Sequence, residues 1–468
     1  MAAVTRTESH SLLVIITAVV LVAVVIIQAG LRSGTEIETV GQLVIIMLTI
    51  GGTAFAVTRQ AWGITTVVFP TAFVFWGLAP LVQIHRDQWL FSVQRGEILL
   101  TQAIVIAWLV AFLLAYRVGW RLPYRAPTLT LRITPRVAGV CWATSLVISL
   151  STIALLEPSA FVTRSAYGTA LGGIISDQVV GILFTFTTRS ALLLALLPLA
   201  QRYLANGWRP DLFRCVVFLT PALVINSPLA FPRYWAFAMI FSGIIWSTIN
   251  TLRSGLVLYF LTVGGILASS LVEPLRRNAS IGAAVADFRI INVADYLTTV
   301  HFDSFQNIVY IQRYVEGNGH TAGEQLFGGL IFWFPRALWS GKPIDSGQLV
   351  YRWLDAAGYP VTFYNHAIPI PGTAWLDFGL IGVVIVGLVY GLTSGVIDDT
   401  LSAGLSIQEG LEKDEVNYLL VAAPLAVGLF LVHIRGSYYS TLAIIGYYAM
   451  AATIVYGFVW ALNLLESS

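Results

Sequence analysis

Charged residues are scarce in this 468-residue sequence. Asp, Glu, Lys and Arg make up 11% of it, against about 25% in an ordinary globular protein, while 57% of the residues are hydrophobic. Apolar runs of about 20 residues recur from end to end, and each is long enough to cross a bilayer core about 30 Å thick. This composition excludes a soluble enzyme with a small anchor and predicts a polytopic membrane protein. The net charge of +2 gives no reason to expect a polyanionic partner such as nucleic acid.

Cysteine and cofactor-binding motifs are also lacking. The two cysteines of the sequence, Cys141 and Cys215, lie inside apolar runs, where a free thiol behaves as a small hydrophobic side chain. We therefore expect no disulfide and no metal site. The sequence has no G-x-x-x-x-G-K-[ST] and no H-E-x-x-H motif, which bind nucleotide phosphates and zinc respectively. We expect chemistry that needs no metal, nucleotide or other cofactor.

The apolar runs predict an all-α fold with about twelve transmembrane helices. The expected spans are 11–30, 40–57, 63–84, 98–116, 137–156, 180–201, 215–231, 233–250, 255–272, 376–396, 416–434 and 440–462. The links after the fourth and sixth spans hold eight arginines: Arg117, Arg121, Arg125, Arg132, Arg136, Arg202, Arg209 and Arg214. Because cytoplasmic loops are enriched in Lys and Arg, we expect both links and both termini to be cytoplasmic.

This orientation predicts three regions. Residues 1–272 are expected to form transmembrane helices 1–9, residues 273–375 a large helical extracytoplasmic loop or cap with a catalytic role, and residues 376–468 helices 10–12. Within the cap, apolar spacing predicts a helix from Asp303 to Val315 that ends at the following glycines. Asp345 or Ser346 is expected to cap a second helix ending near Gly358.

Arginines near the membrane are the first candidate site residues. An arginine inside a span costs about 2.5–3.5 kcal/mol on insertion scales, so Arg189 suggests a function, although an ion pair with Asp177 would also explain it. Arg233 and Arg435 lie at the outer ends of spans and Arg336 lies in the cap. These three guanidinium groups are expected to converge on a lipid diphosphate, since arginine binds phosphate oxygens in a bidentate manner. Snorkelling to headgroups is the alternative for Arg233 and Arg435.

Aromatic and titratable residues of the outer segments suit a sugar substrate. Flat aromatic rings in the cap are expected to stack on pyranose rings, or else to belong to an interfacial belt: Trp333, Trp339, Trp353, Tyr364 and Trp375. Six side chains are candidate proton acceptors for general base catalysis: Asp303, Glu324, Asp345, His366, Asp377 and His433.

Four segments carry a family resemblance. Phe334 to Pro343 is similar to a P-R-x-x-W-x-x-K-P pattern, Asn226 to Arg233 to an N-x-P…R element, and His301 to Asn307 to an F-D-x-x-x-N element. Trp375 to Gly382, followed by Arg435 and Gly436, is similar to a closing region. Taken in their order along the chain, the segments resemble bacterial oligosaccharide repeat-unit polymerases, the Wzy or O-antigen polymerase family. The resemblance covers residues 220–440 in detail.

The resemblance implies a metal-independent membrane glycosyltransferase with a GT-C-type bundle. Such enzymes join oligosaccharide repeats carried on undecaprenyl diphosphate, on the outer face of the bacterial inner or cytoplasmic membrane. The implied partners are the lipid-linked donor and acceptor, the bilayer and a chain-length regulator. The expected diphosphate and substrate ligands are Arg233, Arg336, Lys342, Arg435, Arg189 and Asn226. The candidate catalytic residues are Asp303, Arg336, His366 and Asp377, with Trp339, Trp353 and Tyr364 for sugar stacking.

Other functions stay open at this point. An O-antigen ligase-like enzyme or a glycosyltransferase using a polyprenyl monophosphate sugar would need similar groups. A twelve-span transporter or flippase has a comparable helix count, but carriers usually show paired halves with interrupted helices at matching positions. A large cap between helices 9 and 10 breaks such symmetry, so transport is the less favoured alternative.

Overall fold

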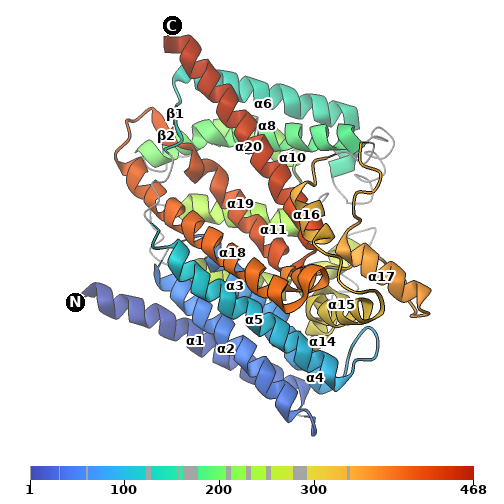
Figure 1. The fold of residues 1–468 in the computed structure, drawn as a ribbon. Helices are drawn as coiled ribbons and strands as arrows, with labels where there is room; N and C mark the ends of the chain where they lie inside the picture. Colours follow the sequence, from blue (N-terminus) through green and yellow to red (C-terminus); the bar gives the residue numbers. More distant parts are fainter. Residues whose placement is uncertain are drawn as a thin grey trace. The chain divides into compact units, whose positions relative to one another are not determined.

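A computed structural model describes residues 2–30, 32–59, 62–122, 128–156, 158–161, 178–206, 212–227, 233–248, 255–277, 292–334 and 338–467. The described part of the chain is built almost entirely of helices (Figure 1). They are α1 (Ala2–Ala29), α2 (Glu36–Arg59), α3 (Thr65–Ala72), η1 (Phe73–Leu78), α4 (Ala79–Arg86), α5 (Arg95–Gly119), α6 (Pro135–Leu156), η2 (Pro158–Phe161), α8 (Gln178–Asn206), α9 (Leu212–Arg214), η3 (Cys215–Leu219), α10 (Thr220–Val224), α11 (Arg233–Thr248), α12 (Leu256–Arg277), α14 (Val293–Leu297), η4 (Val300–Phe302), α15 (Ser304–Asn318), α16 (Glu324–Leu330), α17 (Ser346–Ala356), α18 (Ile370–Glu409), α19 (Tyr418–Arg435) and α20 (Tyr438–Ser467).

The predicted all-α polytopic membrane fold is confirmed. In the described part of the chain, nine helices are long and apolar enough to cross a bilayer: His10–Ala29, Glu36–Arg59, Thr65–Arg86, Arg95–Gly119, Pro135–Leu156, Leu183–Leu204, Ile370–Glu409, Tyr418–Arg435 and Tyr438–Ser467. Three predicted spans are not among these nine: 215–231, 233–250 and 255–272. In these regions the structure describes only shorter apolar helices, and some of the residues in or next to them are not described. The total of twelve therefore stays a prediction.

The chain divides into two compact units, each made of separate stretches of sequence. Unit 1 comprises residues 1–123, 253–398 and 430–443, and unit 2 comprises residues 124–252, 399–429 and 444–468. In unit 2 a buried apolar core joins α6, α8, α19 and α20. A short antiparallel pair of strands, β1 (Thr130–Arg132) and β2 (Glu415–Asn417), connects two of its links.

The third predicted span forms the buried centre of unit 1. Residues 65–86 run as α3, η1 and α4, and the side chains of their most apolar window are all buried, as expected of a helix that is hydrophobic on every face. Asp398 of α18 caps its start, because its carboxylate accepts hydrogen bonds from the backbone N–H of Ile64 at 2.6 Å and the hydroxyl of Thr65 at 2.6 Å. This carboxylate therefore satisfies free N–H groups at a helix N-terminus.

Small residues bring α18 against α5 in unit 1. Gly387, Gly391 and Gly395 recur one helical turn apart and face the α5 backbone. A Cβ at Gly391 would lie 2.1 Å from the carbonyl oxygen of Phe112, so the close approach requires glycine. This is the small-residue packing typical of transmembrane helix pairs.

The cap-like segment contains the two helices expected from its sequence. The predicted helix at 303–315 is α15, which ends at Asn318 before Gly319. The helix predicted after residue 345 is α17, where the Asp345 carboxylate accepts from the Gly347 N–H at 2.9 Å. The two helices share a buried core with Phe91, in the link between α4 and α5. The boundaries of the predicted regions 1–272, 273–375 and 376–468 are not tested by this arrangement.

Candidate functional site

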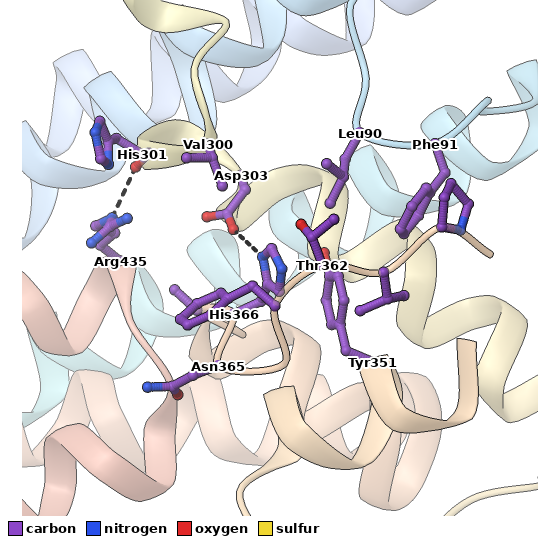
Figure 2. A pocket seen from close by; sticks show the side chains of 14 residues that line it. Leu90, Phe91, Val300, His301, Asp303, Tyr351, Thr362, Asn365, His366 and Arg435 are labelled. Carbon is purple, nitrogen blue, oxygen red and sulfur yellow. Dashed lines mark hydrogen bonds and ion pairs between the residues drawn. The ribbon is translucent and has the colours of Figure 1, made fainter. Parts of the chain in front are cut away.

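A pocket of about 490 Å³ lies in unit 1, where the link between α4 and α5, the start of α15, the connection from α17 to α18 and the end of α19 meet (Figure 2). It is lined by Leu90, Phe91, Val300, His301, Asp303, Tyr351, Pro360, Val361, Thr362, Phe363, Asn365, His366, Ala367 and Arg435. Three of the candidate residues from the sequence, Asp303, His366 and Arg435, are therefore in one cavity. Figure 2 shows the Asp303 carboxylate directed at the His366 ring.

Asp303 and His366 form a buried carboxylate–imidazole pair. Oδ2 of Asp303 lies 2.8 Å from Nδ1 of His366, and the side chains are 3% and 5% exposed. A carboxylate only accepts hydrogen bonds, so Nδ1 must donate its proton and a neutral His366 carries its lone pair on Nε2. The pair thus fixes the tautomer that a general base requires. The second oxygen of Asp303, Oδ1, is buried and has no hydrogen bond within the described residues.

The imidazole is held from a second direction by Tyr351 of α17. The Tyr351 ring stacks on His366 with centroids 3.7 Å apart and an interplanar angle of 10°. Its hydroxyl donates to Oδ1 of Asn307 at 2.5 Å, and Nδ2 of Asn307 donates to the carbonyl oxygen of Ala367 at 2.8 Å. Burial raises the pKa of the Tyr351 phenol well above its ordinary value, so Tyr351 stays a neutral hydrogen-bond donor. The ring of His366 is therefore fixed by stacking and by its backbone as well as by Asp303.

Arg435 supplies positive charge to the same pocket. It is the last residue of α19, and its Nε donates to the carbonyl oxygen of His301 at 2.9 Å. Its guanidinium carbon lies 5.6 Å from the centroid of the Phe75 ring. Within the described residues, neither terminal nitrogen of Arg435 makes a hydrogen bond or an ion pair. These nitrogens have the geometry to bind two oxygens of a phosphate.

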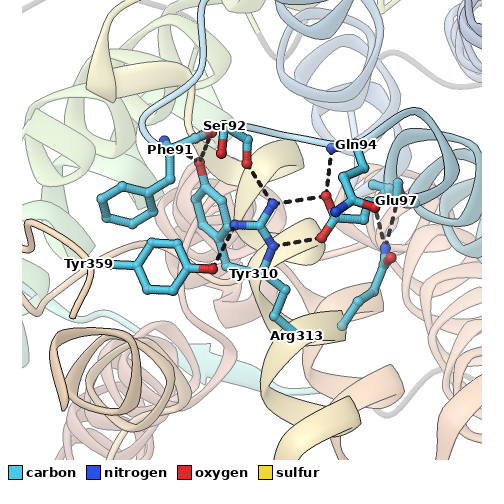
Figure 3. Close-up of polar contacts among 9 residues, drawn as sticks. Phe91, Ser92, Gln94, Glu97, Tyr310, Arg313 and Tyr359 are labelled. Carbon is cyan, nitrogen blue, oxygen red and sulfur yellow. Dashed lines mark hydrogen bonds and ion pairs between the residues drawn. The ribbon is translucent and has the colours of Figure 1, made fainter. Parts of the chain in front are cut away.

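A second polar cluster lies around the link between α4 and α5 (Figure 3). Arg313 of α15 binds both carboxylate oxygens of Glu97, from Nε at 2.6 Å and from a terminal nitrogen at 2.8 Å, and also donates to the carbonyl oxygen of Ser92 at 2.5 Å. The Tyr310 hydroxyl accepts from the N–H of Phe91 at 2.8 Å. Hydrogen bonding to Glu97 raises the pKa of Arg313 further, so this cation is permanent. The cluster fixes the link that carries Leu90 and Phe91.

Asp377, a predicted catalytic residue, caps a helix instead. The backbone of α18 leaves helical geometry at Gly379, with φ +61° and ψ −150°, and Asp377 lies just before this break. Its carboxylate accepts from the N–H groups of Gln325 at 3.2 Å and Leu326 at 2.7 Å and from the Thr321 hydroxyl. These contacts stabilise the start of α16, and Asp377 does not line the pocket.

The predicted cation Lys342 and the predicted stacking residues also lie away from the pocket lining. Nζ of Lys342 donates to the carbonyl oxygens of Phe332 at 2.7 Å and Phe334 at 2.8 Å, which holds the turn after α16. Trp339 packs beside Phe327 and Phe334, Trp353 packs beside Tyr314, and the Tyr364 hydroxyl donates to Asp355 at 2.6 Å. The aromatic rings that line the pocket are Phe91, Tyr351 and Phe363.

Arg189 and Asn226 belong to a separate buried cluster in unit 2. The Arg189 guanidinium lies 3.4 Å above the Trp235 ring and donates to Oδ1 of Asn226. Nδ2 of Asn226 donates to the carbonyl oxygens of Thr188 at 3.0 Å and Ala222 at 2.8 Å. The side chain of Arg233, residue Arg336 and the alternative partner Asp177 lie outside the described residues, so the expected convergence of three arginines is not tested.

The other candidate proton acceptors have structural partners or are exposed. His433, 1% exposed, contacts the Tyr390 hydroxyl at 2.8 Å and the Thr441 hydroxyl at 2.6 Å. Asp345 accepts from Ser440 at 2.6 Å in addition to capping α17. Glu324 is an exposed first residue of α16.

Tyr351 and Asn307 were not singled out as site residues from the sequence. Asn307 stood in the quoted F-D-x-x-x-N element, and its place one helical turn after Asp303 could have linked it to the same face of α15. No local pattern marks Tyr351. Comparison of the chain with protein-family models, with curated proteins and with solved structures gives no match.

Proposed function

We propose that this protein is a membrane glycosyltransferase that polymerises oligosaccharide repeat units carried on undecaprenyl diphosphate. The observation that carries the proposal is the pocket in which a buried Asp303–His366 pair and the guanidinium of Arg435 occur together. The pair offers a base for a sugar hydroxyl, and Arg435 offers a ligand for a diphosphate. Two of the resembling segments, 301–307 and 435–436, contribute Asp303 and Arg435, whereas His366 lies outside all of them.

In the proposed reaction, His366 is the base and the arginines stabilise the leaving diphosphate. Nε2 of His366 takes the proton of the acceptor hydroxyl while the hydroxyl oxygen attacks the anomeric carbon of the donor. The bond from the anomeric carbon to the diphosphate oxygen breaks, and its electron pair stays on the leaving diphosphate. Arg435, together with Arg233 and Arg336, stabilises the negative charge that develops there. The products are a longer lipid-linked glycan and free undecaprenyl diphosphate, and His366 then releases its proton to water.

The predicted orientation agrees with this reaction. The stretches that form the pocket are the link 87–94, residues 300–303, residues 360–367 and Arg435. The distribution of arginines predicts that all four stretches lie on the extracytoplasmic side. We therefore propose that the site faces outward from the bacterial cytoplasmic membrane, at the depth of lipid headgroups. A donor anchored in the outer leaflet would reach it with its diphosphate first.

A polymerisation assay tests the proposal. Purified protein in lipid nanodiscs, given only lipid-linked repeats, should produce a ladder of glycans, whereas a ligase would transfer glycan only after a lipid core acceptor is added. His366→Gln should lower kcat by about 10²–10⁴-fold, the usual contribution of a general base. Arg435→Gln, Arg233→Ala and Arg336→Ala should each stop elongation in protein that is still folded and inserted.

Arg352→Gln is the matched control, since Arg352 is an exposed arginine of α17 that does not line the pocket. It should elongate at the wild-type rate. Wild-type elongation by both His366→Gln and Arg435→Gln would overturn the assignment of this pocket. Elongation retained in two of the three variants of Arg233, Arg336 and Arg435 would dismiss the shared diphosphate site.

A further inference from the structure

Two further cavities lie in unit 1, one between α2 and α5 and the other at the end of α5. The first, of about 370 Å³, is lined by Met47, Leu48, Gly51, Gly52, Phe55, Leu113, Leu114, Tyr116 and Arg117. The second, of about 450 Å³, is lined by Arg117, Val118, Arg121 and Leu122. Arg117 lines both, so an apolar groove continues into a basic one. None of these residues belongs to the pocket of Asp303 and His366.

The apolar part of the groove exists because α2 lacks side chains at one point. Gly51 and Gly52 line the groove; a Cβ added to Gly51 would have no heavy atom within 4 Å, whereas one added to Gly52 would point at the Phe69 ring of α3. On either side, Met47 is 62% exposed and Leu114 is 61% exposed. Both helices are membrane-spanning candidates, so these apolar side chains are exposed to lipid. The apolar lining of the groove therefore suits an acyl chain rather than a polar solute.

The basic end of the groove carries three arginines. Arg117 and Arg121 are exposed, and the guanidinium carbon of Arg59, at the end of α2, lies 4.8 Å from the centroid of the Phe55 ring in the groove. None of the three has a hydrogen bond or an ion pair with another described residue. The carboxylate of Asp398, which the Tyr116 hydroxyl contacts, is buried and accepts hydrogen bonds from Ile64, Thr65 and Tyr116.

Simple snorkelling does not account for this arrangement. An arginine that only snorkels needs apolar surface for its stem and water for its charge. It requires neither a concave apolar groove nor two further cations at the same end. A phospholipid with an anionic headgroup accounts for both the apolar groove and the cluster of arginines. Its acyl chain fills the glycine-lined groove, and its phosphate neutralises the guanidinium groups.

We propose that the groove between α2 and α5 binds one anionic phospholipid, with an acyl chain along Met47, Gly51 and Leu114 and the phosphate on Arg117 and Arg121. Arg59 adds charge from the opposite helix. The arginine-rich link that follows α5 predicts the cytoplasmic leaflet for this lipid. The site is independent of the proposed glycosyl transfer, because the lipid is a bound structural ligand and no bond in it changes.

Native mass spectrometry of the full-length protein tests the site with phosphatidylglycerol and phosphatidylcholine as probes. Wild-type protein should retain phosphatidylglycerol in preference to phosphatidylcholine. Each arginine near a membrane surface contributes about 1 kcal/mol, which is about fivefold in affinity. The Arg117→Gln/Arg121→Gln variant should therefore bind phosphatidylglycerol about 25-fold more weakly. Arg136→Gln, the same change at an exposed arginine outside both cavities, should bind as the wild type does.

Gly51→Leu tests the apolar half of the site without changing charge. The open space at Gly51 accommodates a leucine, and leucine favours the helix more than glycine does, so the variant should fold. It should lose bound phosphatidylglycerol while keeping all three arginines. Equal lipid retention by Gly51→Leu and wild type, or by the double arginine variant and Arg136→Gln, would overturn the proposal. So would full stabilisation of the protein by glycerol phosphate, which has the headgroup charge but no acyl chain.

Discussion

The Asp303–His366 pair gives the sharpest prediction, because replacing Asp303 by asparagine changes the pair in a defined way. Asparagine has nearly the same shape, and its amide can donate a hydrogen bond where the carboxylate could only accept one. Across the 2.8 Å contact to Nδ1, an amide donor would favour the His366 tautomer with its proton on Nε2. The lone pair of the imidazole would then lie on Nδ1, directed at residue 303, and Nε2 would have none to accept the proton of a substrate hydroxyl. Asp303→Asn should therefore fold normally and lack an effective base.

The magnitude follows from two losses. A hydrogen bond from an imidazolium to a carboxylate stabilises the protonated imidazole by about 1.5–3 kcal/mol. Asp303→Asn removes this stabilisation of protonated His366. The inverted tautomer removes the base itself, whose usual contribution is about 10²–10⁴-fold. We expect kcat for elongation to fall within that range, which corresponds to about 2.7–5.5 kcal/mol of transition-state energy. KM for the lipid-linked repeat should change little, since Arg435 is still present to bind the diphosphate.

The assay is elongation of lipid-linked repeats at saturating substrate, with thermal unfolding measured on the same preparations. Asp355→Asn is the control, because Asp355 is an exposed carboxylate of α17 that is bonded to Tyr364 and does not line the pocket. The double variant Asp303→Asn/His366→Gln should be no slower than His366→Gln alone, since residues acting as one unit are not additive. A kcat for Asp303→Asn within twofold of wild type, in protein of unchanged stability, would refute the role of the pair.

Two further predictions concern stability and orientation. Arg313→Met leaves the Glu97 carboxylate, whose side chain is 15% exposed, without its bidentate partner. We expect thermal unfolding to show about 3 kcal/mol of destabilisation, and much less in the double variant Arg313→Met/Glu97→Gln. Equal losses of stability in both variants would contradict the ion-pair argument. Cysteines placed at the exposed residues Ala357 and Ser406 should react with a membrane-impermeant maleimide from opposite sides of sealed vesicles, and labelling from the same side would contradict the predicted topology.

Local features of the fold could be read from the sequence because their causes are local. The start of α17 follows from the Asp345 side chain, and the end of α15 follows from Asn318 and Gly319. Long apolar runs likewise predict membrane helices without knowledge of their neighbours. The close contact of α18 with α5 is different, since a glycine spacing shows only that a close approach is possible and does not name the partner helix.

The candidate site was predicted in part, and the reason lies in sequence separation. Asp303 and His366 were both candidates, but 63 positions separate them, and they meet because the connection from α17 to α18, which carries His366, lies against the start of α15. Asp377 was a candidate because its side chain is a carboxylate. Residue type alone does not distinguish a carboxylate that caps a helix from one that contacts a substrate. What separates the two roles is the set of N–H groups of Gln325 and Leu326, which depends on the break in α18 at Gly379.

The contrast between Asp303 and Asp377 also explains why the pair with His366 is the better catalytic candidate. Both carboxylate oxygens of Asp377 accept hydrogen bonds from backbone N–H groups or a hydroxyl. These bonds offset the cost of burying the carboxylate, so Asp377 stabilises the fold. Asp303 has one oxygen on His366 and a second, Oδ1, that is buried without a hydrogen bond in the described chain. An unsatisfied buried carboxylate oxygen costs stability; Glu38 also has one, Oε2, but Asp303 lines the pocket and Glu38 does not. A sugar hydroxyl entering the pocket beside His366 would supply the missing donor, so substrate binding and orientation of the base would reinforce each other.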